Sequence, residues 1–147
     1  MELKNIPEII TGGIHSDERG ELLYNNDFDL TTIKRMYIIK HPDKNVVRAW
    51  QGHQQEHKFF KCIRGSFVVA WKKIDDFNNP TDNHKADYTV LTESENNLLS
   101  VPPGYANGIK ALEANAELMV FSDFKLGESL DDKIRFDKNL WLDWDQF

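Results

Sequence analysis

Apolar residues in the first 125 positions come in short runs, and turn-forming residues separate these runs. No stretch of this part repeats its apolar positions with a helical period over about eleven residues, as an amphipathic helix would. Brief apolar runs between turns are typical of an all-β sandwich or small barrel. The runs occupy residues 36–40, 58–63, 66–74, 86–92, 97–101 and 116–124, and the turn-forming stretches occupy residues 41–45, 64–66, 78–83, 93–96, 102–108 and 113–116.

The C-terminal tail, residues 127–147, has a different pattern and is the part of the chain that favours a short helix. We expect this helix to begin near Ser129, because Asp131 and Asp132 would then lie in its first turn, where the helix dipole favours negative charge. The tail also contains Trp141 and Trp144. Large aromatic residues are highly buried on average, so they are expected to pack the tail onto the barrel.

The 147 residues fit one domain, residues 1–147, with 40% hydrophobic residues to fill its core. A lone cysteine, Cys62, excludes an internal disulfide framework and is expected to be a buried core residue. The sequence shows no signal-peptide pattern and no apolar stretch long enough for a membrane span, so we expect a soluble cytoplasmic protein. The net charge of −6 argues against a nucleic-acid partner, but a few placed Arg and Lys residues can still bind a small anion.

One polar stretch, residues 48–67, raises the question of a site. If residues 51–55 form a strand, then Gln51, His53 and Gln55 share one face. That face is a metal site, a catalytic site or an ordinary solvated surface, and periodicity alone does not choose among them. A Pro-Pro-Gly corner at residues 102–104 separates two apolar strands later in the chain.

Taken together, these motifs resemble the nucleotide-sugar branch of the cupins over nearly the whole chain. The resemblance is to dTDP-4-keto-6-deoxyhexose 3,4-ketoisomerases and dTDP-4-dehydrorhamnose 3,5-epimerases, and it implies an RmlC-like jelly-roll β-barrel. The matching segments are "DERG" at 17–20, "IKRMYII" at 33–39, "RAWQGH" at 48–53, "VPPGYANG" at 101–108, "SDFKLGE" at 122–128 and "KIRFDKNLW" at 133–141.

The resemblance also implies that the metal site of other cupins is missing. Metal-binding cupins use two histidines, a glutamate and a later histidine, and these positions hold Gln51, His53, Lys58 and Asn107 here. A first-row metal needs about three protein donors. We therefore expect no metal and no cofactor. Glu56 and His57 would become possible metal ligands only if the register of this stretch were shifted.

Proton transfer beside a ketone suits histidine, whose unperturbed pKa is about 6.5. The resemblance therefore implies His53 as the base and Tyr37 as the group that protonates or orients the enolate oxygen. Gln51 replaces the first histidine of the ketoisomerase motif, and Phe124 and Lys125 stand where the epimerases carry a late tyrosine.

The resemblance also implies a set of residues that bind the substrate. Basic residues are expected on the diphosphate and nucleotide, with one of them, Arg19, reaching across a dimer interface. Amide side chains are expected to form hydrogen bonds with sugar hydroxyls. The basic residues are Arg19, Arg35, Arg48 and Lys58, and the amides are Gln51 and Asn107. Three other histidines, His15, His41 and His84, fall in loop-like stretches and are expected in solvent.

The reaction expected is metal-free 3,4-ketoisomerisation of a dTDP-4-keto-6-deoxyhexose through an enediol. Three alternatives stay open: a non-catalytic cupin that binds sugar nucleotides, an epimerase with a changed active site, and a metal-dependent dioxygenase. A small barrel of this kind leaves a sheet edge exposed, which invites pairing with a second chain. We therefore expect a C2 homodimer that exchanges the N-terminal segment through "DERG".

Overall fold

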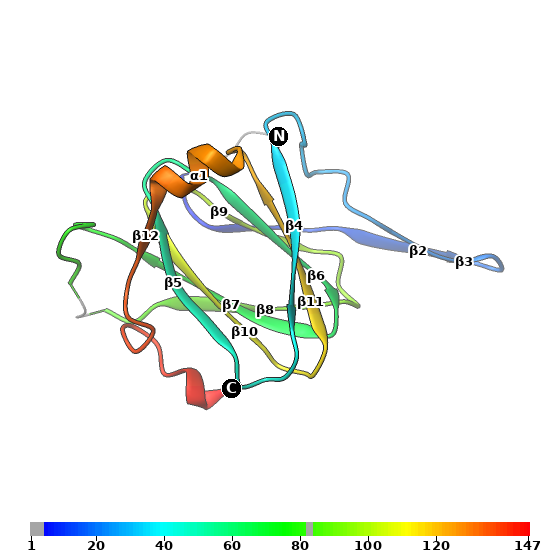
Figure 1. Cartoon of the computed structure of the whole chain (residues 1–147). Coiled ribbons are helices and arrows are strands. Elements are labelled where there is room, and N and C mark those ends of the chain that lie inside the picture. The colour runs from blue at the N-terminus through cyan, green and yellow to red at the C-terminus, as the bar shows by residue number, and fades with distance from the viewer. Residues whose placement is uncertain (1–4, 82–83) are drawn as a thin grey trace.

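The computed structural model describes residues 5–81 and 84–147, so the predicted turn at 78–83 ends outside the described residues. The described chain is built mainly of antiparallel strands, with one short helix near the C-terminus (Figure 1). The elements are β1 (Glu8–Ile10), β2 (Gly13–Asp17), β3 (Gly20–Tyr24), β4 (Arg35–His41), β5 (Val47–His53), β6 (Lys58–Arg64), β7 (Ser66–Lys73), β8 (Asp87–Thr92), β9 (Leu98–Val101), β10 (Tyr105–Ala111), β11 (Ala116–Ser122), α1 (Leu126–Asp132), β12 (Lys133–Arg135) and the 3-10 turn η1 (Trp144–Gln146).

Two five-stranded sheets face each other and enclose the core. Their strand orders are β1-β9-β6-β11-β4 and β12-β5-β10-β7-β8, while β2 and β3 form a separate hairpin. Non-consecutive strands are neighbours in both sheets, which is the connectivity of a jelly roll rather than of a meander. The predicted cupin jelly roll with a short helical tail is confirmed.

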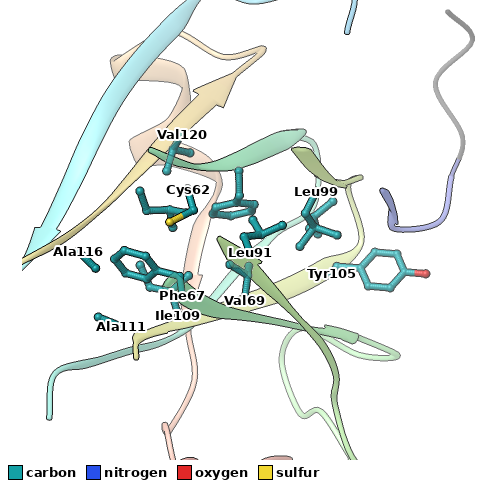
Figure 2. Packing of buried hydrophobic residues seen from close by; sticks show 13 residues of the cluster. Cys62, Phe67, Val69, Leu91, Leu99, Tyr105, Ile109, Ala111, Ala116 and Val120 are labelled. Carbon is teal, nitrogen blue, oxygen red and sulfur yellow. The ribbon is translucent and has the colours of Figure 1, made fainter. Parts of the chain in front are cut away.

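The core between the sheets follows the period of two that strands impose on side chains. In β11, Ala116, Leu118 and Val120 point inward and are buried, while the residues between them are partly exposed. Figure 2 shows side chains from β6, β7, β8, β9, β10 and β11 meeting in this cluster. Cys62 is among them, so its expected burial is confirmed, and burial raises the pKa of its thiol to about 11.

The tail packs against the outer side of the second sheet. The indole of Trp50 on β5 lies 5.4 Å from Trp141 and 5.5 Å from Trp144 between ring centroids, so the expected packing of the tail is confirmed. Helix α1 begins at Leu126, three residues before the expected start. The reason is a capping interaction, because the Glu128 carboxylate accepts the backbone N–H of Lys125 at 3.1 Å.

Several strands were not visible in the apolar pattern. They are β1, the hairpin β2–β3, most of β5, β10 and β12. The hairpin projects away from the two sheets (Figure 1), and its residues are largely exposed, which explains the weak apolar signal. The turn expected at 102–108 is confined to its first three residues, because β10 begins at Tyr105.

Candidate functional site

A pocket of about 580 Å³ opens between the two sheets, where the edge strand β4 of the first sheet faces β5 of the second. Strands β6 and β10 and helix α1 complete its walls. A cavity of this size accommodates a small-molecule ligand. The lining residues are Arg35, Met36, Tyr37, Ile38, Ile39, Lys40, Arg48, Gln51, Lys58, Phe60, Asn107, Ile109, Leu126, Ser129, Leu130 and Lys133.

Six of the eight residues predicted for the site line this one pocket: Arg35, Tyr37, Arg48, Gln51, Lys58 and Asn107. They come from three consecutive strands, β4, β5 and β6, and from the later strand β10, and the fold brings them together. His53 and Arg19 do not line it. Phe124 and Lys125, which replace the epimerase tyrosine, lie outside it as well.

A bulge in β5 brings Arg48 and Gln51 to the same face. Gln51 pairs with Asn107 and Arg48 pairs with Ile109, so three steps along β5 match two steps along β10. One residue of a bulged strand is left over, and the side-chain alternation is offset by one from there on. Arg48 therefore faces the pocket, although a regular strand would turn it to the opposite side from Gln51.

The pocket is electropositive in an otherwise acidic protein. Five cationic residues line it, and none of the lining residues among those the structure describes is acidic. The chain as a whole carries a net charge of −6, so the pocket concentrates charge of the opposite sign. These cations are Arg35, Lys40, Arg48, Lys58 and Lys133. Such a lining favours an anionic ligand.

Arg48 is oriented by His41 at the wall of the pocket. The Arg48 Nε donates to His41 Nε2 at 3.2 Å. Burial, and then the positive charge of Arg48, lower the pKa of His41, which keeps the ring neutral and able to accept this bond. The expectation that His41 lies in solvent was wrong, since it is 1% exposed at the end of β4, next to Phe67. His15 and His84 are exposed, as expected.

A buried carboxylate, Glu56, lies directly behind the pocket wall. It accepts hydrogen bonds from Ser122 Oγ and from Ser129 Oγ, the latter at 2.7 Å, and forms an ion pair with Arg35 at 3.1 Å. Lys58 Nζ approaches it to 3.4 Å. Burial by itself would raise the pKa of Glu56, but the bond from Ser122 and the charge of Lys58 outweigh burial and lower it. Glu56 is therefore an ionised anchor for the pocket cations.

His53 is enclosed beside Glu56 rather than exposed to the pocket. Its side chain is 2% exposed, and its Nδ1 lies 3.1 Å from Glu56 Oε2 and 3.9 Å from Asp132 Oδ2. The approach to Glu56 is not aligned as a hydrogen bond, and neither ring nitrogen has an aligned partner among the described residues. Burial, and then the charge of Lys58, lower the pKa of His53 to about 4, against the opposing effect of the two carboxylates. The ring is neutral near pH 7.

Asp132, at the end of α1, fixes the loop that follows β5. Its two carboxylate oxygens accept the backbone N–H groups of Gln54, Gln55 and Glu56 at 2.7 to 3.0 Å. Three amide donors on one carboxylate form a nest that places Glu56 under the pocket. Asp132 was expected only to complement the helix dipole, and its contact with Glu56 was hidden by a separation of 76 positions.

His53, Glu56 and Asp132 bring three donor atoms within 4.8 Å of one another, which is a spacing that metal sites also show. The donors do not fit a metal ion, because Glu56 already binds two hydroxyls and Arg35, and Asp132 binds three backbone amides. Lys58 adds a positive charge 3.4 Å from Glu56.

Arg19 lies at the tip of the β2–β3 hairpin, which projects away from the pocket (Figure 1). It is 82% exposed and pairs with Asp17 at 2.6 Å. Because the hairpin extends away from its own barrel, Arg19 has no access to the pocket of its own chain.

A second cavity, of about 750 Å³, lies between the C-terminal tail and the second sheet. It mixes cations with the carboxylates of Asp143 and Asp145. Its most buried cation, Lys110, already donates to the backbone carbonyl of Trp144 at 2.8 Å. None of the residues predicted for the site lies there, so we regard the first pocket as the candidate site.

The jelly roll and its electropositive pocket define a cupin of the RmlC-like type. The model of the family described as FdtA, WxcM-like, C-terminal, matches residues 1–140. The chain therefore belongs to the WxcM-like, C-terminal family. No protein of curated function matches the sequence significantly.

Solved structures with this fold confirm the jelly roll. The RmlC epimerase of Mycobacterium tuberculosis aligns with a TM-score of 0.75 at 20% identity, over 94% of this chain and 74% of its own. The 3,4-ketoisomerase QdtA of Thermoanaerobacterium thermosaccharolyticum, in complex with TDP, aligns with a TM-score of 0.68 at 24% identity, over 92% and 90%. The dTDP-4-dehydrorhamnose 3,5-epimerase of Bacillus anthracis, with TDP and PPi bound, aligns with a TM-score of 0.76 at 14% identity, over 94% and 84%.

Proposed function

We propose that this protein binds a dTDP-linked 4-keto-6-deoxy sugar in the electropositive pocket and isomerises it between the 3-keto and 4-keto forms through an enediol. The observation that supports this most is the convergence of six motif residues on one pocket lined by cations but by no acidic residue among those described. Family membership and the TDP complexes of QdtA and the Bacillus anthracis epimerase support the same ligand class.

The proposed binding mode follows the distribution of charge in the pocket. Arg48, held by His41, and Arg35 bind the diphosphate, since a guanidinium matches phosphate oxygens with two parallel donors. Arg35 Nε is buried without an aligned partner among the described residues, so a ligand oxygen would satisfy it. Gln51 and Asn107, which pair across β5 and β10, hold the sugar hydroxyls.

Tyr37 and His53 are the proposed proton carriers. Tyr37 lies on the pocket wall and reaches the ligand directly, as the enolate role requires. His53 is proposed to accept the carbon-bound proton. Because its ring is buried, contact with a sugar carbon requires the ring or the pocket wall near Ser129 to move.

A second function, binding of the sugar nucleotide without turnover, is favoured by one observation. A base with a pKa near 4 is poorly matched to proton abstraction near neutral pH, where the optimal pKa of a catalytic base is close to the working pH. If His53 were the only base available, the pocket would bind its ligand and leave it unchanged.

Two measurements test these functions separately. Millimolar dTDP should raise the melting temperature, since a ligand at 100 times its Kd adds about 2.7 kcal/mol of stability. Arg48→Met should reduce this shift, whereas Arg64→Met, at an exposed position at the end of β6, should retain it. No shift with dTDP, UDP or GDP would refute the nucleotide-sugar function.

The second measurement is deuterium incorporation from heavy water into dTDP-4-keto-6-deoxyglucose. Enolisation beside the ketone exchanges the carbon-bound proton, so an isomerase labels its substrate. Binding without any label uptake would establish the non-catalytic function instead.

A further inference from the structure

His41 ends the β4 wall of the pocket at the side away from α1. Strand β4 begins at Arg35, whose guanidinium donates to Ser129 of α1 at 3.1 Å, and it ends at His41. The imidazole of His41 is buried and packs against Phe67 of β7 with ring centroids 5.4 Å apart. His41 is not among the residues that line the pocket. Any effect of this ring on a bound ligand therefore passes through a neighbouring residue.

Arg48 is the neighbour through which His41 can act. It is an exposed residue of β5 that lines the pocket. The bond from Arg48 Nε to His41 Nε2, at 3.2 Å, is the only hydrogen bond or ion pair that this side chain makes with the described residues. The N–H groups of its two Nη atoms remain available for a ligand. A guanidinium binds phosphate oxygens with two parallel donors, so the single bond to His41 decides where those donors point.

This bond exists only while His41 is neutral. A neutral imidazole has one unprotonated nitrogen that accepts a hydrogen bond, whereas a protonated imidazole has none. Burial, and then the charge of Arg48, lower the pKa of His41, while Asp43 in the following loop opposes them. The other neighbours are apolar, since β7 contributes Phe67 and β11 places Ala116 opposite His41. Protonation of the ring would set two positive charges against each other and remove the acceptor.

The two arginines proposed to bind the diphosphate are therefore held in different ways. Arg35 pairs with the carboxylate of Glu56 at 3.1 Å. The pKa of Glu56 is lowered, so this carboxylate keeps its charge in mild acid. Arg48 depends instead on a histidine, the side chain that titrates nearest to neutral pH. Mild acid releases Arg48 and leaves Arg35 in place.

We propose that His41 is a positioning residue for the ligand diphosphate: the neutral ring holds Arg48 in the pocket, and protonation of the ring releases Arg48 and weakens binding. This inference rests on the proposed binding of a sugar nucleotide and adds a pH dependence to it, but it does not depend on turnover. Affinity for the ligand should fall as the pH falls through the pKa of His41, because only the neutral ring accepts the bond from Arg48.

The first test measures the Kd of dTDP-glucose by calorimetry for the wild type and for His41→Leu and His41→Gln. Both ends of the diphosphate of dTDP-glucose are esterified, so this probe keeps its charge when the pH is changed. At about pH 8, His41→Leu should bind about 2- to 10-fold more weakly, which is the effect of leaving one long side chain to be ordered by the ligand. His41→Gln keeps an acceptor for Arg48 and should bind like wild type at this pH.

The pH dependence of binding separates positioning from a structural role. From about pH 8 to about pH 4.5, the wild-type Kd should rise about 2- to 10-fold relative to the Kd of His41→Gln, because glutamine does not titrate. The matched control is His57→Gln, which replaces another buried histidine at a position that does not line the pocket. It should show the same pH dependence of the Kd as wild type.

A double-mutant cycle tests whether His41 acts through Arg48. In the background of Arg48→Met, His41→Leu should cause no further loss of affinity, since the side chain that it positions is already absent. A histidine that merely supports the fold would weaken binding by the same factor in both backgrounds.

The outcomes distinguish this inference from the proposed function. No binding of dTDP-glucose by the wild type at any pH would overturn both. If the wild type binds, equal affinity of wild type and His41→Leu at about pH 8, or equal losses in the two backgrounds, would overturn the inference alone. If His41→Leu does not fold, the comparison of wild type with His41→Gln decides, and identical pH dependence in these two proteins would overturn the inference.

Discussion

Acid should destabilise this protein well before its carboxylates are protonated, and His57 provides the clearest cause. The ring of His57 is 4% exposed, stacks on Phe59 with centroids 4.4 Å apart, and lies 2.7 Å from Ser100 Oγ through Nε2. Burial lowers the pKa of His57 to about 4, and the nearby charge of Glu8 offsets this only in part. The unfolded chain takes up this proton at a pH of about 6.5.

The sign of the effect follows from the number of protons that each state binds. Between about pH 6.5 and pH 4 the unfolded state binds the His57 proton and the folded state does not, so the free energy of unfolding falls as the pH falls. At about pH 5 the difference of 1.5 pH units corresponds to about 2 kcal/mol, or about 1 kcal/mol if solvent partly screens the site. The lowered pKa values of His53 and His41 act in the same direction.

The assay is urea unfolding at about pH 7 and about pH 5, for the wild type and for His57→Gln. Glutamine can still bond to Ser100 but does not titrate, so this variant should lose about 1 to 2 kcal/mol less stability than wild type over this range. His84→Gln, at an exposed histidine, is the matched control and should keep the wild-type difference. Equal losses in wild type and His57→Gln would show that His57 is not held neutral by burial, and would refute the reasoning.

The remaining predictions concern the base, the assembly and the metal. His53→Asn should keep the dTDP-induced melting shift and lose at least about 100-fold in exchange, and turnover at the wild-type rate would remove His53 as the base. Sedimentation at micromolar concentration should show a homodimer, and Arg19→Ala should then weaken dTDP binding; a pure monomer contradicts both. Elemental analysis after dialysis should find no stoichiometric metal. One equivalent of metal in the wild type that is lost in His53→Ala would contradict this prediction. It would indicate a metal site formed by His53, Glu56 and Asp132.

The apolar pattern predicted the strands with continuous or alternating apolar residues, and missed strands interrupted by glycine and polar residues. In β11 a buried residue alternates with a partly exposed one, so the strand is visible in the sequence. All seven residues of β10 are buried, because one face meets the pocket and the core while the other lies under the tail. Gly108 reads as a turn residue, yet a Cβ there would lie 2.7 Å from the indole of Trp144, so close packing explains the glycine.

For the site, resemblance found residues that line the pocket and missed the residues that hold them in place. Tyr37 belongs to a matching segment, Lys58 stands at the position of the glutamate ligand of metal-binding cupins, and the two side chains meet in the pocket. From the sequence, Glu56 was expected only as a possible metal ligand, and Ser129 only as the start of a helix. Their contact joins residues 73 positions apart, and no local pattern signals such a partnership. Cys62, Trp141 and Trp144 were placed correctly because size and polarity decide their burial.

The bulge in β5 has a consequence for anyone who alters this strand. Arg48 and Gln51 share the pocket face although two residues separate them, so the alternation of pocket-facing positions shifts by one within the strand. A mutagenesis library that varied every second residue after Arg48 would reach Trp50 and Gly52, which pack against the tail, and would damage folding without reaching Gln51 in the pocket. Different residues of one strand therefore line the pocket and pack against the tail. The pocket can be altered at Arg48 and Gln51 without replacing Trp50, which packs against the tail.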